Sequence, residues 1–224
     1  MKVKLIDSMG DDIRVANAAR VSFHKKSMPV PTGDGVSKKD KGLINYLAKH
    51  GHWTPFGHVY ATLYVKAPIF VARQLVKHQV GLVWNEVSRR YVTEEPEFYF
   101  PDTWRGKPEN AKQGSSDEVI ESLVIDEFGH ELEIDAMLKQ NAQIVDRAYR
   151  ALINNGVAPE QARMILPQNM YTEWYWSGSL IAFARICGLR CRPDTQKESQ
   201  EIGWMINDAV KNIASNSWEA LKTW

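Results

Sequence analysis

Hydrophobic and polar residues follow one another along this chain with two different periods, which predict both helices and strands. In residues 131–156, which end at Asn-Asn-Gly, apolar side chains recur at helical spacing and fall on one face. These apolar positions are Ile134, Met137, Ile144, Ala148 and Leu152. In residues 58–67, HVYATLYVKA, apolar and polar side chains alternate, as they do in a strand with one buried face.

The same criteria place strands and helices along the whole chain. Strands are expected at residues 3–6, 58–67, 87–93 and 169–177. Helices are expected at residues 11–23, 42–50, 68–79, 131–156, 159–164, 180–188 and 202–213. The segments 24–41 and 95–116 contain proline, glycine and polar residues and are expected to be loops. Because helices and strands are interspersed without an internal repeat, we expect one mixed α/β domain over residues 1–224, with a central sheet flanked by helices.

The composition excludes several broad classes of protein. Of the 224 residues, 28 are Lys or Arg and 27 are Asp or Glu, so the net charge is +1 and no chain-wide surface for nucleic acid or membrane is expected. No apolar run is long enough to span a bilayer, and the start, MKVKLIDSMGDD, lacks the apolar stretch of a signal peptide. Cys187 and Cys191 do not make a disulfide framework. We therefore expect a cytoplasmic protein whose anion sites are local clusters.

Polar side chains are concentrated in residues 73–91, RQLVKHQVGLVWNEVSRRY. The helix predicted from residue 68 continues to about Gly81. On this helix Gln74, Lys77 and His78 are spaced i, i+3 and i+4, and therefore share a face. This spacing predicts either a ligand-binding face or an ordinary solvated one.

After the glycine, three polar side chains occupy alternate positions of the chain. Glu86, Ser88 and Arg90 are spaced so that they share one face of the predicted strand. A carboxylate, a hydroxyl and a guanidinium together suit a polar ligand that offers both donors and acceptors, such as a nucleotide.

Four stretches of the chain carry a motif pattern in a definite order. The first three are AARVSF (18–23), HWTPFGH (52–58), and KHQ (77–79) followed by NEVSRRY (85–91). The fourth is ARMILPQNMYTEWYW (162–176), which continues into GLR (188–190). Taken together, they resemble the flavin-dependent thymidylate synthase family, whose signature is Arg-His-Arg followed after seven residues by a serine.

The chain departs from the family pattern at several positions. KHQ replaces the Arg-His-Arg triplet, and eight residues rather than seven separate it from Ser88. Gly57 stands where the family often has a glutamate, and Ser-Leu-Ile at 179–181 replaces an Asn-Ala-Arg triplet. Several of these positions contact the flavin in the family, so the substitutions concern flavin binding more than nucleotide binding. The divergence also suggests a phage or another mobile element as the source, and a phage-encoded protein would act in the host cytoplasm.

The resemblance implies a role for each matching residue. It implies that dUMP is bound by Gln74, Lys77, Glu86, Val87, Ser88, Arg89, Arg90, Arg163 and Arg190. It implies that FAD is contacted by His52, Thr54, Lys77, His78, Gln79, Glu86, Ser179 and Arg185. Arg190 is the implied catalytic residue, because its counterpart in the family is credited with ionising N3 of the uracil ring. A planar guanidinium suits this role, since it can pair with a carbonyl and a deprotonated nitrogen.

The resemblance also implies a reaction and an assembly. One carbon would pass from methylenetetrahydrofolate to C5 of dUMP, with FAD as hydride carrier and NADPH as reductant, to give dTMP. The implied enzyme is a homotetramer whose active sites are shared between subunits, and its partners are dUMP and folate rather than nucleic acid or membrane. Two alternatives stay open: a flavin-dependent pyrimidine-nucleotide hydroxymethylase, and a nucleotide-binding protein that has lost catalysis.

Other candidate chemistries carry less weight. His50, His52 and His58 offer nitrogen ligands, but their spacing fits no standard zinc site, and we expect no metal. Ser88 has no evident His–Asp relay in the sequence, so we expect it to orient a ligand rather than to act as a nucleophile. The two cysteines lie one helical turn apart; core packing is the expected role, and a catalytic thiolate is the alternative.

Overall fold

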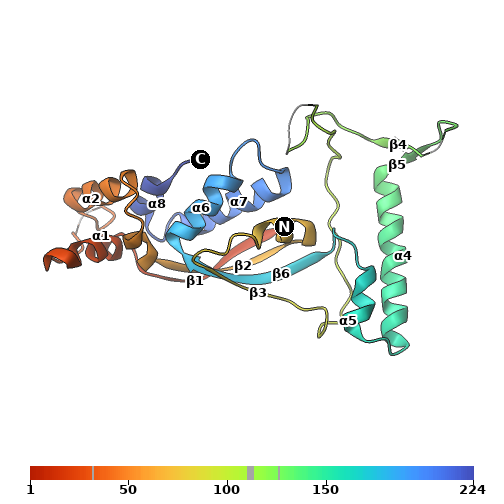
Figure 1. Cartoon of the computed structure of the whole chain (residues 1–224), viewed down its shortest axis with the longest axis horizontal. Helices are drawn as coiled ribbons and strands as arrows, with labels where there is room; N and C mark the ends of the chain where they lie inside the picture. The colour runs from red at the N-terminus through yellow and green to blue at the C-terminus, as the bar shows by residue number, and fades with distance from the viewer. Residues whose placement is uncertain (32, 110–113, 126) are drawn as a thin grey trace. The chain divides into compact units, whose positions relative to one another are not determined.

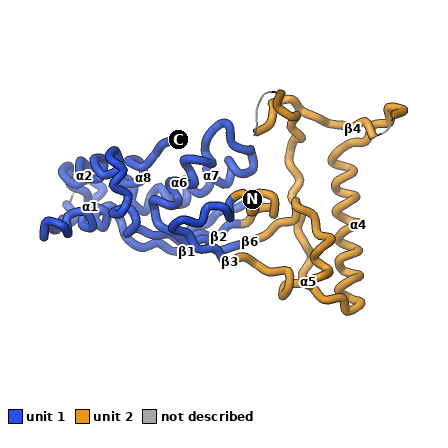
Figure 2. Tube along the Cα trace, viewed as in Figure 1, with its two compact units in different colours: residues 1–65, 75–85, 174–224 blue, residues 66–74, 86–173 orange. Residues whose placement is uncertain are grey.

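The computed structural model describes residues 1–31, 33–109, 114–125 and 127–224 (Figure 1). The chain divides into two compact units, which are described separately (Figure 2). Unit 1 comprises residues 1–65, 75–85 and 174–224, and unit 2 comprises residues 66–74 and 86–173. Helices and strands are interspersed along the chain, so the predicted mixed α/β class is confirmed.

The main sheet has four strands in the order β1-β2-β6-β3. They are β1 (Lys2–Met9), β2 (Tyr60–Pro68), β3 (Leu82–Glu86) and β6 (Tyr171–Ser179). The central strands are antiparallel, because Leu180 N, just after β6, donates to Val59 O, just before β2, at 2.8 Å. Side chains of β2 and β6 alternate between buried and more exposed positions, as the alternating sequence predicts.

Helices of unit 1 cover the sheet and supply most of its core. They are α1 (Asp12–Arg20), α2 (Lys38–Lys49), α6 (Leu180–Arg190), α7 (Lys197–Val210) and α8 (Ser215–Leu221), with short 3₁₀ helices η1 (Val21–Phe23) and η2 (Thr54–His58). Helix α6 packs on α7, α7 packs on β1, and α2 packs on α8. Trp174, Trp176 and Trp218 are buried, and the ring of Trp84 stacks on that of Trp174 at 4.1 Å. The many aromatic residues are therefore largely core residues.

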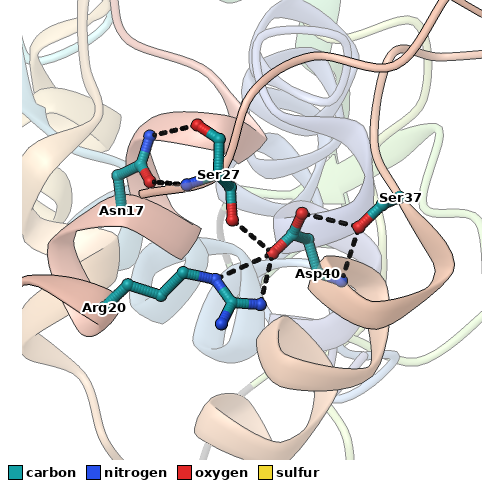
Figure 3. Close-up of polar contacts among 5 residues, drawn as sticks. All are labelled: Asn17, Arg20, Ser27, Ser37 and Asp40. Atoms are coloured by element: carbon teal, nitrogen blue, oxygen red, sulfur yellow. Dashed lines mark hydrogen bonds and ion pairs between the residues drawn. The ribbon is translucent and has the colours of Figure 1, made fainter. Parts of the chain in front are cut away.

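A buried carboxylate fixes the base of the loop between α1 and α2 (Figure 3). Asp40 accepts hydrogen bonds from Arg20 Nη2, Ser27 Oγ and Ser37 Oγ, each at 2.6 Å. Burial opposes the charge of Asp40, but these hydrogen bonds and the positive charge of Arg20 outweigh it and hold the pKa of Asp40 below its usual value. The side-chain amide of Asn17 also makes two hydrogen bonds with the backbone of Ser27.

The same network explains why α2 begins at Lys38 rather than at the predicted residue 42. Ser37 is the N-cap, and its side-chain oxygen accepts a hydrogen bond from Asp40 N at 3.1 Å. The predicted loop 24–41 therefore ends four residues early. In the sequence, Ser37 stands directly before a run of lysines and looks like a loop residue, so its role as the N-cap was not predicted.

Unit 2 contains a helical pair and a small hairpin. Its elements are α3 (Ile69–Leu75), α4 (Ile134–Asn154), α5 (Pro159–Ala162), the 3₁₀ helix η3 (Arg163–Ile165), and the antiparallel strands β4 (Ser122–Val124) and β5 (Glu131–Glu133). The long helix is confirmed, but part of its predicted apolar face is not buried. Ile144 is 48% exposed, whereas Ala142, Asp146 and Tyr149 are buried.

Two predictions for residues 68–93 are wrong. Helix α3 ends at Leu75, not near Gly81, so Lys77 and His78 do not share a helix face with Gln74. The chain reverses in a few residues to enter β3, with His78 N donating to Leu75 O at 3.0 Å and Gly81 at a φ of 75°. Pairing of β3 with β6 imposes this reversal, which helical periodicity cannot predict.

The expected strand at 87–93 is a turn. The strand covers Leu82–Glu86, and one more ladder bond follows it, from Val87 N to Glu173 O at 2.9 Å. The carbonyl of Ser88 then accepts a hydrogen bond from Tyr91 N at 2.9 Å and closes the turn. Local hydrogen bonding replaces the ladder here, so Ser88 and Arg90 do not lie on a strand face with Glu86.

Candidate active site

Unit 2 contains a pocket of about 440 Å³ at the end of β3. It is lined by Ile69, Glu86, Val87, Ser88, Arg89, Arg90, Arg163, Leu166, Met170 and Thr172. Six of the predicted nucleotide contacts, the consecutive residues 86–90 and Arg163, are thus brought together, although 73 positions separate Arg90 from Arg163. We name this cavity the arginine pocket.

The turn at residues 88–91 gives the arginine pocket its shape. Arg90 N and Nε both lie 3.3 Å from Ser88 Oγ, so the serine hydroxyl holds the arginine from within the turn. The guanidinium of Arg90 also lies 5.1 Å from the centre of the Tyr91 ring. Arg89 donates through Nη1 to the carbonyl of Glu94. The turn therefore presents two arginines in fixed directions.

The charge of the pocket favours an anion. Arg89, Arg90 and Arg163 carry three positive charges against the single carboxylate of Glu86. Arg163 is exposed and donates through Nε to Glu160 O at 3.3 Å. Guanidinium groups bind phosphate oxygens through paired hydrogen bonds, so this pocket suits a phosphorylated ligand. The lining residues include no histidine or lysine.

Thr172 is a pocket residue that the sequence did not single out. Its side chain is almost completely buried, and its Oγ1 donates a hydrogen bond of 2.6 Å to Glu86 Oε1. The threonine stands inside the quoted motif stretch 162–176, but no spacing rule relates it to a residue 86 positions earlier. Ile69, Leu166 and Met170 supply the apolar wall and were likewise not predicted.

Gln74, another predicted nucleotide contact, is a half-buried residue of unit 2. It does not appear among the residues that line the arginine pocket. The remaining predicted contacts, Lys77 and Arg190, belong to unit 1, as do seven of the eight predicted flavin contacts.

In unit 1, the predicted catalytic residue contacts a predicted flavin ligand. Arg190, the last residue of α6, donates through Nε to His78 Nε2 at 3.1 Å. Burial and the positive charge of Arg190 lower the pKa of His78 to about 4. His78 is therefore a neutral hydrogen-bond acceptor at physiological pH. Lys77 and Gln79, its neighbours in the chain, are exposed.

Other predicted flavin contacts lie near exposed rings of unit 1. His52 is exposed beside Tyr46 and His50, with ring centres 6.0 and 6.4 Å away, and Thr54 begins η2. Arg185 is exposed, and its guanidinium lies 5.9 Å from the centre of the Trp53 ring. Exposed flat rings and cations suit a planar group that carries phosphates, so these residues fit a flavin dinucleotide.

Ser179, another predicted flavin contact, lies where β6 ends and α6 begins. It is buried at the N-cap of α6, and its backbone N–H donates to Gly81 O at 3.2 Å. This contact links the start of α6 to the segment that carries His78. The replacement of an Asn-Ala-Arg triplet at 179–181 therefore falls at a junction between β3 and β6.

Cys187 and Cys191 are both buried free thiols. Among the residues that the structure describes, no group of three or more His, Cys, Asp or Glu side chains is placed to hold a metal ion. Cys187 is buried and donates to Gly203 O, and its hydrogen bond with Cys191 and its burial raise the pKa of its thiol. No described helix is both long enough and apolar enough to cross a bilayer.

Comparison with known proteins gives matches over nearly the whole chain. The family described as "Thymidylate synthase complementing protein" matches residues 4–215. A flavin-dependent thymidylate synthase of Thermus thermophilus is 39% identical over 220 residues, covering 98% of this chain and 75% of that protein. The enzyme of the same name from Thermosipho africanus is 36% identical over 221 residues, covering 97% and 89%. Among solved structures, a UMP/dUMP methylase, PolB from Streptomyces cacaoi bound with 5-Br UMP, aligns with a TM-score of 0.78 at 27% identity, covering 98% and 92% of the chains.

Proposed function

Because the chain belongs to the flavin-dependent thymidylate synthase family, we propose that it methylates C5 of dUMP to give dTMP. Methylenetetrahydrofolate would donate the carbon, NADPH would be the reductant, and the flavin would be FAD. Once reduced by NADPH, the bound flavin would supply the hydride that converts the transferred carbon to a methyl group. The protein's part is to bind, orient and polarise the pyrimidine nucleotide.

The arginine pocket is the observation that carries this proposal. Its three guanidinium groups suit the phosphate of a nucleoside monophosphate, and its carboxylate and hydroxyl groups suit the sugar and base. Its volume, about 440 Å³, lies in the range of small-molecule sites. We assign the nucleotide to this pocket through Glu86, Val87, Ser88, Arg89, Arg90 and Arg163, and keep Gln74 and Lys77 as proposed contacts from the family resemblance.

Arg190 is the proposed catalytic residue. A guanidinium that pairs with the O2 or O4 carbonyl and the N3 atom of uracil stabilises the ring after N3 loses its proton. The resulting negative charge spreads to C5 and makes this carbon a better nucleophile. After C5 has formed its bond to the transferred carbon, the C5 hydrogen would leave as a proton, and the bond from the transferred carbon to the folate nitrogen would break.

For FAD we propose the contacts that the family resemblance implies. The candidates are His52, Thr54, Lys77, His78, Gln79, Glu86, Ser179 and Arg185. The exposed rings around His52 and Trp53 support stacking with the flavin, and the exposed cations Lys77 and Arg185 support binding of its phosphates. A homotetramer remains part of this proposal, and size-exclusion chromatography with light scattering tests it directly.

The first experiment is mass spectrometry of the small molecules released when freshly purified protein is denatured. FAD in the supernatant supports the proposal; absence of any flavin, with no binding of added FAD, contradicts it. The second step is incubation with dUMP carrying tritium at C5, together with methylenetetrahydrofolate and NADPH. Release of tritium with formation of dTMP is expected. A hydroxymethylated nucleotide would identify the hydroxymethylase alternative, and nucleotide binding without tritium release would identify an inactive binding protein.

The structural neighbour adds one comparison to that assay. PolB is described as a methylase of both UMP and dUMP, and its fold aligns with 98% of this chain. UMP should therefore be tested beside dUMP. A preference for dUMP by the ratio of kcat/KM values supports thymidylate synthesis as the main reaction.

A further inference from the structure

The contact between Arg190 and His78 joins a guanidinium to an imidazole rather than to a carboxylate. The guanidinium is half-buried, as is the imidazole. Arginines are seldom fully buried unless they are paired, usually with a carboxylate that neutralises much of their charge. Within the residues that the structure describes, no carboxylate forms an ion pair with Arg190, and its side-chain partner is the imidazole at 3.1 Å.

The direction of the hydrogen bond fixes the state of the histidine. Arginine Nε carries a hydrogen and can only donate, so Nε2 of His78 must be the unprotonated acceptor. The ring proton then lies on Nδ1, and the imidazole is neutral. The pKa of about 4 for His78, lowered by burial and by the charge of Arg190, agrees with this state.

The backbone of Arg190 packs closely against α7. A β carbon at Gly203 would lie 3.0 Å from Arg190 Cβ and 3.1 Å from its carbonyl carbon. Only a residue without a side chain allows this close approach of α7 to the end of α6. The backbone that carries Arg190 is thus fixed by packing, while its side chain is directed by His78.

We propose that His78 is a positioning residue for Arg190, which it orients without neutralising its positive charge. This inference rests on the proposed function, in which Arg190 stabilises the uracil ring as N3 loses its proton. A carboxylate in place of the imidazole would also orient the guanidinium, but it would compete with the anionic ring for the positive charge. A neutral acceptor satisfies Nε and leaves the terminal nitrogens, with the full charge of the group, available to the substrate.

The test compares three variants of the full-length enzyme. His78→Leu removes the acceptor but keeps side-chain bulk, His78→Gln supplies an amide oxygen near the position of Nε2, and His130→Leu is a control at an exposed histidine outside the site. For each variant we would measure the released FAD, the dissociation constant of dUMP by calorimetry, and kcat and KM for dTMP formation.

His78→Leu is expected to retain FAD through the seven other proposed contacts, to weaken dUMP binding about tenfold and to lower kcat about 100-fold. The reason is that a misdirected guanidinium loses more in the transition state than in the ground state. His78→Gln should recover most of both losses, and His130→Leu should match the unaltered enzyme. Unchanged dUMP affinity and kcat in His78→Leu would overturn the proposal. Loss of FAD in both His78 variants, with dUMP affinity unchanged, would also overturn it and assign His78 to the flavin alone.

The calorimetric series separates this inference from the proposed function. If the unaltered protein neither holds FAD nor makes dTMP, the proposed function fails. In that case the dUMP affinities of the variants still test the inference. Weaker binding in His78→Leu with recovery in His78→Gln supports the positioning role, and equal affinities in all three proteins refute it.

Discussion

Thr172 Oγ1 donates a hydrogen bond of 2.6 Å to Glu86 Oε1 inside the arginine pocket. The threonine is near the start of β6 and the glutamate is the last residue of β3, so the pairing of these two strands creates the contact. The hydroxyl of Thr172 holds the carboxylate of Glu86 in one orientation. The glutamate is therefore already oriented before the proposed nucleotide binds.

Thr172→Val removes this hydroxyl while keeping the shape of the side chain. A hydrogen bond to a charged group contributes about 1.5–3 kcal/mol, so we expect the dissociation constant of dUMP to rise about tenfold or more. Thr172→Ser retains the hydroxyl and should stay close to the unaltered protein. Calorimetric titration with dUMP measures both, and equal affinities of the Val and Ser variants would contradict the orienting role.

Arg163→Ala should weaken nucleotide binding through loss of a phosphate partner. We expect the dissociation constant of dUMP to rise about 10- to 100-fold, and the dependence of affinity on salt to become shallower, because one cation leaves the pocket. Arg147→Ala is the matched control: this arginine of α4 is exposed and donates to Gln143 O at 3.4 Å. Calorimetric titrations at two salt concentrations measure the dissociation constant of dUMP for both variants. An equal loss of affinity in the two would contradict a specific phosphate contact by Arg163.

Gly178→Ala should destabilise unit 1 by overpacking. A β carbon at this position would lie 2.5 Å from Leu82 Cδ2 and 2.7 Å from Gly81 O, so the start of β3 would have to move. Overpacking of this kind costs about 1–3 kcal/mol, which lowers Tm by several degrees in a chain of this size. Gly42→Ala, in α2 with nothing within 4 Å of the added carbon, should leave Tm unchanged or raise it. Thermal unfolding followed by circular dichroism measures the Tm of both variants. Equal Tm values would contradict overpacking and show that the strands accommodate the added β carbon.

Asp40→Asn should lower stability by leaving Arg20 without its buried carboxylate (Figure 3). Removing one partner of a buried pair costs about 3–5 kcal/mol. Asp208→Asn, which breaks an exposed ion pair with Lys211 in the last turn of α7, should change stability by less than about 1 kcal/mol. Urea unfolding at pH 7 measures both variants, and equal losses would mean that burial of Asp40 contributes nothing.

The Asp40 interaction also has a predicted pH dependence. The folded-state pKa of Asp40 lies below the unfolded value of 3.8, so the unfolded chain binds a proton more readily. The stabilisation is therefore fully present above about pH 3.8 and is lost as the pH falls through the folded-state pKa. Urea unfolding between pH 7 and pH 3 should show a shallower acid loss in Asp40→Asn than in the unaltered protein.

The sequence by itself determined much of the secondary structure and the family. Alternation in residues 58–67 and 169–177 predicted the two central strands, β2 and β6, to within two residues, and the apolar run at 180–188 predicted α6. These elements follow from a local period that burial imposes on the chain. The motif stretches indicated the family that the comparisons confirm, and five consecutive pocket residues, 86–90, were predicted from one of them.

Only the tertiary structure decided where the chain turns and which side chains meet. Helix α3 stops at Leu75 because the chain then turns to pair β3 with β6, a strand about 90 residues further along. Strand β3 stops at Glu86 because a turn closed by the carbonyl of Ser88 replaces the ladder with β6. The contacts of Thr172 with Glu86 and of His78 with Arg190 arise in the same way. A local period carries no information about such partners, since the free energy that fixes them comes from burial and hydrogen bonding between distant segments.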